Sequence, residues 1–293
     1  MERFAQSLVT GILTGGIYSM AAIGLSLIFG VLKVINFAHG SLLMVGMFVA
    51  YGVATFLGLN IYLATIIVVP VLFLFGFFIE KLFIYPLIRT ERSEIVEPVS
   101  ALLLTIGISI FLDNIFLVIF GADYRSIPGS QLPSTLYLGD VAVDLPKLYS
   151  LGAAIGLAIA LQLVMTKTAL GLSIQATSQD RDAAVLQGIN VPYVYAITFG
   201  IGIATLGVAA CFIAPFFYIH PSGFMIITIR AYMVVVLGGL GSITGAIAGG
   251  ILVGLIESLG SLYVTATSAD IFVFILFVLV LILKPSGLMG KDV

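Results

Sequence analysis

Long runs without a charged residue constrain this chain more than any other feature of its sequence. No Asp, Glu, Lys or Arg lies between Lys33 and Glu80, and the run from Leu8 to Leu32 holds 25 uncharged residues. A helix of that length extends about 37 Å, enough to cross a hydrocarbon core of about 30 Å with some tilt. It also exceeds the roughly 7–15 apolar residues of a secretory signal peptide, so the run predicts a retained membrane span.

Composition extends this conclusion to the whole chain. Of the 293 residues, 61% are hydrophobic and only 9% are charged, whereas a soluble domain carries about 25% charged residues. We therefore predict an all-α, polytopic integral membrane protein, 1–293 forming one membrane domain of about eight or nine segments with broken or re-entrant helices. The net charge of −2 argues against nucleic acid as a partner. The single cysteine, Cys211, lies in an apolar run and predicts a small core residue.

Breaks and polar stretches divide the apolar sequence. The run before Glu80 is interrupted near Asn36–Ser41 and at Gly58–Asn60. Further spans are expected at Val99–Phe120, Leu148–Met165, Val194–Ile219, Ile226–Leu262 (with a glycine break and Arg230 near its start) and about Thr267–Leu283. The polar stretches between them are Glu80–Glu97, Gly121–Lys147 and Thr166–Pro192.

Basic residues predict which stretches share a side of the membrane. Three lie in Glu80–Glu97, two in Thr166–Pro192 and two in the C-terminal tail. The positive-inside rule places the first two regions in the cytoplasm, and the tail as well provided that Ile226–Leu262 makes two crossings or dips in and returns. The intervening stretch 121–147 is then external. The side of the N-terminus stays open because Arg3 is offset by Glu2.

The stretch Thr166–Pro192 is a polar island with the signals of a short, separate helix. Thr177 and Asp180 have the T-x-x-D spacing of a capping box. Gly188 suits the left-handed residue that ends a helix, and Pro192 is expected to prevent its resumption nearby. These signals predict a helix of about ten residues.

One face of that helix carries almost no bulky side chains. Asp180, Ala184 and Gly188 fall on one line at i, i+4 spacing, with Ala183 beside it. Such a face is suited to dock into a partner's groove, so Gly188→Trp or Ala184→Glu is expected to uncouple the chain from that partner. The alternative is a connector lying on the membrane surface.

Two similar four-residue motifs predict an internal repeat. Ala38-His39-Gly40-Ser41 and Gly239-Leu240-Gly241-Ser242 stand 201 residues apart, and Ile61–Ile79 maps onto Leu262–Val280 at the same offset. The halves would cover about residues 8–97 and 194–293. Duplicated transporter halves place their pathway at helix breaks.

The polar residues at the first break are candidates for a substrate pathway. Asn36, His39, Gly40 and Ser41 lie within apolar sequence, where a polar side chain is costly without a partner or water. Free backbone groups at the break could hold the ammonium and carboxylate groups of a zwitterion. The alternative is that Asn36 and His39 only cap and pin the break.

Further pathway candidates are Asn114, beside Asp113, and the second break at Gly238, Gly239 and Gly241. For Asp113 and Asn114 the alternative is a hydrogen bond to a neighbouring helix or an interfacial position. Gly245 and Gly249 have the spacing of a close-packing helix face. Glu257 and Asp270 are interpreted as interfacial, and His220 as a turn residue.

Three stretches together resemble a known family. They are GLSLIFGVLKVINFAHGSLLMVGMFVAY (Gly24–Tyr51), ATSQDRDAAVLQGINV (Ala176–Val191) and VVVLGGLGSITGAIAGGILVGLIE (Val234–Glu257). With them the chain resembles the branched-chain amino acid ABC transporter permeases, specifically the H-type subunit, over essentially its full length.

The resemblance implies a multi-pass subunit of the bacterial cytoplasmic membrane. Its implied partners are a second, M-type permease, two ABC ATPase subunits and an extracytoplasmic amino-acid-binding protein. The polar island matches the family's ATPase-coupling loop, with Ala176, Thr177, Asp180, Arg181, Ala183, Ala184 and Gly188 as the residues carried over. One departure is Gln175, because the family often has arginine there.

The motif inventory separates the competing functions. The chain has no G-x-x-x-x-G-K-[ST] phosphate loop, so we expect no cofactor in it and ATP hydrolysis in partner subunits. Urea or amide ABC permeases are an alternative, although they usually carry a large extra N-terminal region. An ion-coupled secondary transporter would favour buried charges near mid-membrane. An enzyme is disfavoured by two His, one Cys and no metal motif.

Overall fold

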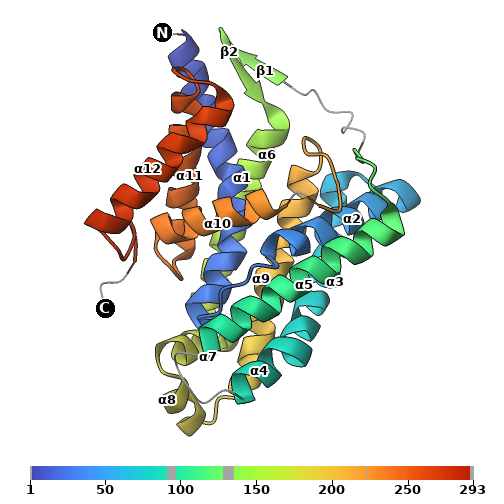
Figure 1. The fold of residues 1–293 in the computed structure, drawn as a ribbon, viewed down its shortest axis with the longest axis vertical. Helices are drawn as coiled ribbons and strands as arrows, with labels where there is room; N and C mark the ends of the chain where they lie inside the picture. The colour runs from blue at the N-terminus through green and yellow to red at the C-terminus, as the bar shows by residue number, and fades with distance from the viewer. Residues whose placement is uncertain (1, 91–96, 128–134, 223, 291–293) are drawn as a thin grey trace.

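The computed structural model describes residues 2–90, 97–127, 135–222 and 224–290, and these residues are almost entirely helical (Figure 1). In chain order the first helices are α1 (Glu2–Leu32), α2 (His39–Leu57), α3 (Ile61–Ile79), the π-helix η1 (Glu80–Ile84), α4 (Tyr85–Thr90) and α5 (Glu97–Phe120). After the strands β1 (Thr135–Leu138) and β2 (Val141–Asp144) come α6 (Leu145–Lys167), α7 (Ala169–Gln179), α8 (Arg181–Leu186), α9 (Val191–Ile213), α10 (Met225–Gly238), α11 (Ile243–Gly260) and α12 (Ala266–Leu283).

The membrane prediction is confirmed. Within the described residues, seven helices are long and apolar enough to cross a membrane, and two shorter apolar helices cover Met225–Gly238 and Ser268–Leu283. Because lipid offers no hydrogen bonds to the backbone, such a chain folds into helices that satisfy their own amide groups. The chain is therefore a polytopic, all-α membrane protein.

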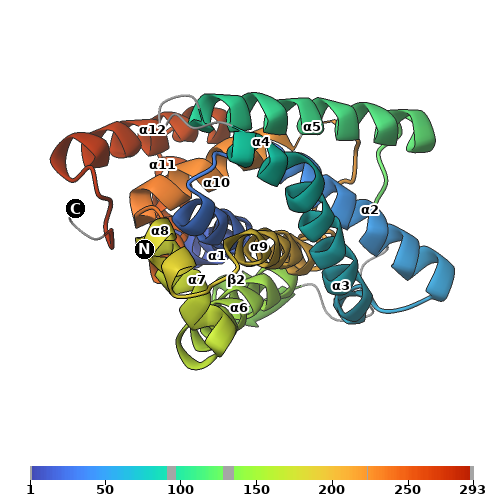
Figure 2. The same cartoon turned by 90° about the horizontal axis from the view of Figure 1, so that it is seen from below.

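Two helices form the centre of the bundle. Figure 2 shows α1 and α9 side by side, with α2, α3, α6, α10 and α11 around them. Most residues of α1 and α9 are buried, whereas α5 and α12 expose much of their surface. Apolarity does not separate the two groups, because α5 and α12 are at least as apolar as α1 and face lipid rather than water. Cys211 on α9 is fully buried, as predicted.

A glycine seam joins α1 to α11. A Cβ atom at Gly15 would lie 2.6 Å from Cα of Ile251, and one at Gly254 would lie 2.4 Å from the Gly11 carbonyl oxygen. Gly249 approaches α10 in the same way, with Val234 O at 2.6 Å. Small residues at such spacing let helix backbones come into van der Waals contact, which stabilises helix pairs in lipid. The packing role predicted for Gly245 and Gly249 is confirmed.

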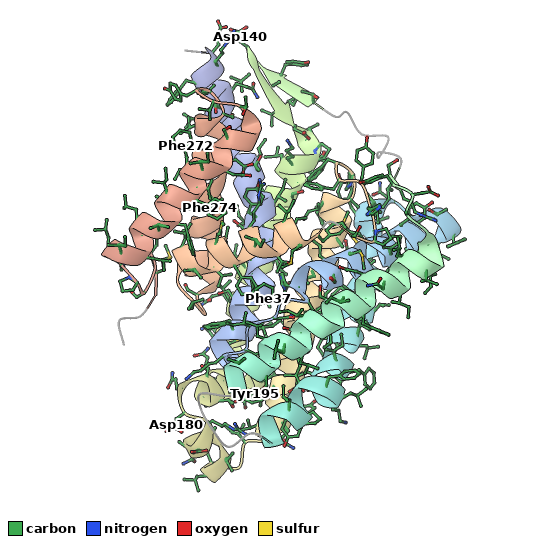
Figure 3. All side chains as sticks on the ribbon, in the orientation of Figure 1. Phe37, Asp140, Asp180, Tyr195, Phe272 and Phe274 are labelled. Atoms are coloured by element: carbon green, nitrogen blue, oxygen red, sulfur yellow. The ribbon has the colours of Figure 1, made fainter. Side chains whose placement is uncertain are left out.

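The molecule has two distinct ends. We call the end formed by α4, α7 and α8 the connector end and the end formed by β1 and β2 the hairpin end; Figure 3 labels Asp180 at the first and Asp140 at the second. The described residues of 80–97 and 166–192 thus share an end opposite the hairpin within 121–147, as predicted. The C-terminal tail turns back to the second break, where the amide of Met289 donates to Gly238 O at 3.0 Å.

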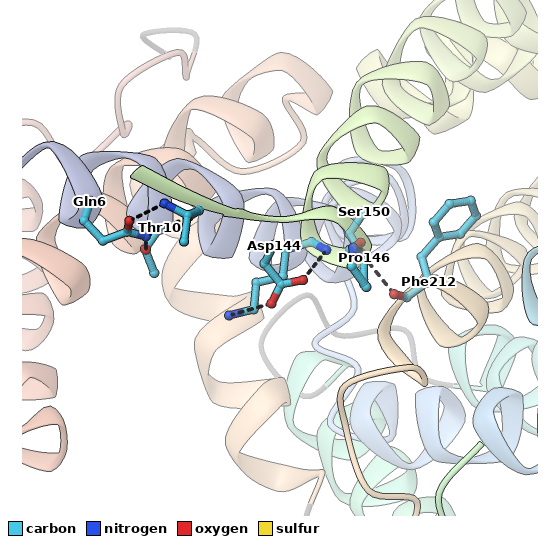
Figure 4. Close-up of polar contacts among 8 residues, drawn as sticks. Gln6, Thr10, Asp144, Pro146, Ser150 and Phe212 are labelled. Carbon is cyan, nitrogen blue, oxygen red and sulfur yellow. Dashed lines mark hydrogen bonds and ion pairs between the residues drawn. The ribbon is translucent and has the colours of Figure 1, made fainter. Parts of the chain in front are cut away.

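The hairpin end is tied to the start of α1. The Gln6 side chain makes two hydrogen bonds with the backbone of Ala142 in β2, each 2.8 Å (Figure 4). Close by, Ser150 on α6 donates to the Phe212 carbonyl of α9 at 3.0 Å. The N-terminus therefore lies on the side opposite the connector end, which the charges of Glu2 and Arg3 had left open.

Several predicted boundaries are wrong, for identifiable reasons. The first span begins at Glu2 rather than Leu8. The stretch 80–97 starts inside a membrane helix, because η1 continues α3 and fully buries Glu80. The stretch 121–147 contains the hairpin β1–β2, whose turn holds Gly139 at φ 64. Its last residues belong to α6, which begins at Leu145 with Asp144 as its cap.

The span predicted at Val194–Ile219 is α9, and both of its ends differ. Pro192 does not delay the helix but occupies its first turn, where its missing N–H needs no partner. The far end stops at Ile213, and Ile219 instead pairs with Arg125 in a short antiparallel bridge. The last predicted span agrees with α12 within one residue.

The internal repeat stays a prediction, and the packing favours another alignment of its halves. α1 packs against α11 and α9 packs against α3. This reciprocal pattern pairs α1–α2–α3 with α9–α10–α11. The 201-residue offset instead matches α3 to α12 and sets the start of α2 against the turn after α10.

Candidate functional site

The polar island forms two helices rather than one. α7 is capped by Thr168, whose hydroxyl accepts from the Gly171 amide, and α8 is capped by Asp180, which accepts from the Ala183 amide at 2.9 Å. Thr177 lies within α7 and donates to the Ser173 carbonyl, so the capping box predicted for Thr177 and Asp180 is wrong. A hydroxyl inside a helix can donate to the carbonyl four residues earlier, and Thr177 makes that bond instead of capping a helix.

The end of the second helix agrees with its sequence signal. α8 stops at Leu186, and Gly188 follows in the left-handed region at φ 80. Because a side chain there would be strained, Gly188→Trp changes the backbone as well as the surface.

The exposed surface of α8 is mixed rather than uniformly small, because the polar Arg181 and Asp182 are exposed together with Ala183, Val185 and Leu186. Ala184 is only 3% exposed and packs against its own chain, whereas Val185 is 54% and Leu186 86% exposed. The predicted line of Asp180, Ala184 and Gly188 therefore is not one open face, although Ala183, Asp180 and Gly188 are exposed. Ala184→Glu would bury a charge within this chain, so it does not test a docking surface.

Two side chains fix the island to the membrane helices. The guanidinium of Arg181 lies 5.9 Å from the ring centre of Tyr195 on α9. Gln175, which stands where the resembling family often has arginine, donates to the Met165 carbonyl at the end of α6 at 2.5 Å. Ala176 lies half-buried on α7, next to Gln175. α7 and α8 are thus held against α6 and α9.

We expect Asp180→Ala to weaken the start of α8 by about 1 kcal/mol, because the Ala183 amide loses its acceptor. Hydrogen exchange should show faster exchange of the Ala183 and Ala184 amides. Asp180→Asn keeps an acceptor at the same place and should exchange like the parent protein. Equal protection in the alanine variant would contradict this role for Asp180.

The first helix break is closed by hydrogen bonds. Asn36 and His39 are fully buried; Oδ1 of Asn36 accepts from the Ala38 amide, and Nε2 of His39 donates to the Ala21 carbonyl at 2.7 Å. The Gly40 amide donates to Thr228 on α10 at 2.8 Å. Ser41 lies 2.7 Å from the Ser109 hydroxyl of α5.

These contacts support the pinning role for His39, whose second ring nitrogen has no hydrogen-bond partner among the described residues. The Nδ2 of Asn36 likewise has none there. The pathway role of both residues stays a prediction.

Thr228→Val should destabilise the protein by about 1–3 kcal/mol, since it leaves the buried Gly40 amide without an acceptor. Thermal unfolding in detergent measures the effect, and Thr228→Ser should retain most of the stability. Equal loss in both variants would show that the methyl group, rather than the hydroxyl, matters.

The second break is a tight turn filled by the tail. Gly239 and Gly241 have φ values of 105 and 83, and Ser242 caps α11 by accepting from the Gly245 amide. The turn lies against Gly30 on α1, where a Cβ atom would be 2.8 Å from Cα of Gly241. The Leu288 amide donates to the Leu237 carbonyl at 2.8 Å, so the tail covers this turn. The glycine break predicted at Gly238–Gly241 is confirmed, and its role as a gate stays a prediction.

Asp113 and Asn114 point in different directions. Asp113 is half-buried and interacts with Ser41 on α2, whereas Asn114 is exposed and donates to the Ile110 carbonyl of its own helix at 2.7 Å. The structure does not bring Asn114 together with either break.

A charged cluster lies between α1, α10, α11 and α12. Arg230 on α10 bonds Asp270 on α12 at 2.9 Å, pairs with Glu257 on α11 at 3.3 Å and donates to the Tyr18 hydroxyl. Tyr18 on α1 in turn donates to Glu257 at 2.6 Å. The interfacial assignment of Glu257 and Asp270 therefore missed their main interaction, which joins four helices.

Arg230 lines two cavities. One of about 290 Å³ is lined by Tyr18, by Arg230 and by loop residues that include His220. The other, of about 220 Å³, lies between α10, α11 and α12 and is lined by Arg230, Glu257 and Asp270. Ile226 and Arg230 border both. His220 also joins two loops, through Ser222 and the Ala122 carbonyl.

Comparison with known proteins shows which family the chain belongs to. Residues 7–283 match the family described as "Branched-chain amino acid transport system / permease component". The chain belongs to this permease family. It is 31% identical to the high-affinity branched-chain amino acid transport system permease protein BraD of Pseudomonas aeruginosa, over 99% of this chain and 96% of BraD. It is 30% identical to LivH of Escherichia coli, a permease protein of the same description, over 98% and 96% of the two chains. Among solved structures, PsaBC from Streptococcus pneumoniae in complex with Fab has a TM-score of 0.48 and 12% identity over 98% of this chain and 93% of that chain.

For this permease, the charged residues that line a cavity were not identified as a site from the sequence. Arg230 was noted only as a charge near the start of an apolar run. Its isolation there was the available signal, because an arginine within a membrane segment needs a partner of opposite charge. Tyr18 carries no such signal, since tyrosine is common in membrane helices.

Proposed function

We propose that this permease is the membrane-spanning subunit of an ABC importer that moves branched-chain or other amino acids across the bacterial cytoplasmic membrane. The observation that carries the proposal is the similarity to amino acid permeases at about 30% identity over nearly the full chain. The membrane bundle supports it, because a multi-pass helical body is what a permease requires.

ATP hydrolysis is assigned to separate ATPase subunits that contact the connector end. The exposed side chains of Val185 and Leu186 support this contact, since adjacent exposed leucine and valine on a polar loop favour a protein partner over water. Closure of the ATPase pair on ATP would push α8, and the attachments of α7 and α8 would pass that movement to α6 and α9. The connector end is then cytoplasmic, and the hairpin end faces the binding protein that delivers the amino acid.

A second, M-type permease is proposed to complete the pathway. α5 and α12 support such a pairing, because both expose much of their length. Asn114 lies on the exposed side of α5, where an amide facing lipid alone would be costly.

Reconstitution tests the proposal. The chain is co-purified with its partners from native membranes, placed in liposomes with the binding protein, and assayed for uptake of labelled leucine, isoleucine, valine and urea. Uptake of an amino acid that needs ATP hydrolysis is the expected result. Uptake driven by an ion gradient without ATP, or uptake of urea in place of amino acids, would contradict the proposal.

A further inference from the structure

We propose that the cavity between α10, α11 and α12 binds an aliphatic amino acid in its zwitterionic form, with Arg230 holding the carboxylate and Asp270 the ammonium group. The proposal rests on the proposed function and deepens it, because it locates a substrate contact within this chain.

The walls of the cavity suit an aliphatic side chain. Six apolar residues line it beside the three charged ones, namely Ile226, Ile229, Met233, Val253, Val273 and Phe274. Phe274 lies on α12, as labelled in Figure 3. A mainly apolar cavity with a few convergent polar groups is typical of small-molecule sites.

The charges suit a zwitterion. Arg230 brings one positive charge, and Glu257 and Asp270 bring two negative charges, so the cluster has one carboxylate in excess. Asp270 accepts the hydrogen bond from Arg230 through Oδ1, and its Oδ2 takes no part in this bond. A guanidinium has five N–H donors, more than its bonds here to Tyr18, Glu257 and Asp270 use.

A ligand that carries one charge of each sign leaves the net charge of this cluster unchanged at −1 and gives each of its own charges an opposite partner. The ammonium group meets the excess carboxylate, and the ligand carboxylate meets the remaining guanidinium donors. A ligand with only an anionic group would add a second uncompensated negative charge, which is costly in a site partly withdrawn from water.

The position of the cluster favours a ligand site over a purely structural ion pair. Asp270 keeps 42% of its side chain exposed, although it bonds Arg230. Arg230 also borders the second cavity, which is lined by the loop residues Phe217, Tyr218 and His220.

Ligand binding to the full-length chain in lipid nanodiscs tests the site. Saturation-transfer NMR compares L-leucine with isocaproate, which lacks the amino group, and with isoamylamine, which lacks the carboxylate. The parent chain should bind leucine at least about tenfold more tightly than either analogue, because each analogue loses a charge-assisted contact. Asp270→Asn should reduce leucine affinity about tenfold and remove its advantage over isocaproate. Arg230→Lys, the second variant, should reduce the advantage of leucine over isoamylamine.

Asp144→Asn is the matched control, since Asp144 has a similar exposure of 43% and caps α6, a role that asparagine also fills. It should bind all three probes like the parent chain. Absence of leucine binding to the parent chain, or an unchanged ratio of leucine to isocaproate in Asp270→Asn, would overturn the site. If ATP-driven uptake by the assembled parent complex persists in that case, the proposed function stands; loss of that uptake in the parent complex would instead count against the function.

Discussion

Leu186→Glu should abolish ATP-driven amino acid uptake while leaving the permease in the membrane. Leu186 is 86% exposed on α8, so the substitution removes almost no contact within this chain. In a docked interface, however, it would bury a carboxylate without a partner, which costs several kcal/mol. Since each 1.4 kcal/mol is a factor of ten in affinity, co-purifying ATPase should fall at least about tenfold.

Leu136→Glu is the control for this prediction. Leu136 is also an exposed leucine, but it lies on β1 at the hairpin end. The amount of ATPase recovered with this variant should equal that of the parent chain. Normal uptake and normal ATPase recovery with Leu186→Glu would remove the support for docking at α8.

Gly254→Ala should lower the thermal stability of the permease by several degrees. The added Cβ atom would lie 2.4 Å from the Gly11 carbonyl oxygen and from the Gly15 amide nitrogen, both of them backbone atoms of α1 that cannot rotate away. The helices would have to separate along their glycine seam, and overpacking of this kind costs about 1–3 kcal/mol or more. Thermal unfolding in detergent, followed by fluorescence-detected size exclusion, measures the change.

Gly156→Ala provides the matched comparison. It is also a helical glycine, on the exposed side of α6, and a Cβ atom there meets nothing within 4 Å. Alanine favours helix over glycine by up to about 1 kcal/mol, so this variant should unfold at the same or a slightly higher temperature. Equal destabilisation of both variants would show that the α1–α11 seam is not held by close backbone contact.

The fold class was predictable because it depends on composition and run length, which need no tertiary knowledge. The two breaks were predictable too, since Asn36, His39 and the glycines at 238–241 stand out within apolar sequence. Boundaries were harder, because the same residue can have two roles. Pro192 can stop a helix or start one, and Thr177 can cap a helix or bond within it; neighbours distant in sequence decide between these roles.

The interactions between helices were not predictable from one sequence. Arg230 finds its partners on α1, α11 and α12, and no local pattern joins Tyr18 to Glu257 across 239 residues. Ala184 belongs to the small-residue line on a helical projection, yet the packing of α8 against the bundle buries it. The basic residues predicted that Thr166–Pro192 shares an end of the molecule with α4, but the helical projection did not predict which face of α8 is exposed.

Site-specific photocrosslinking from position 186 in native membranes tests directly whether an ATPase subunit docks on α8. A photoreactive amino acid replaces Leu186, cells are irradiated, and the crosslinked partner is identified by mass spectrometry. We expect a partner that carries a G-x-x-x-x-G-K-[ST] phosphate loop and that faces the cytoplasm. Crosslinks only to lipid, or to an extracytoplasmic protein, would contradict it.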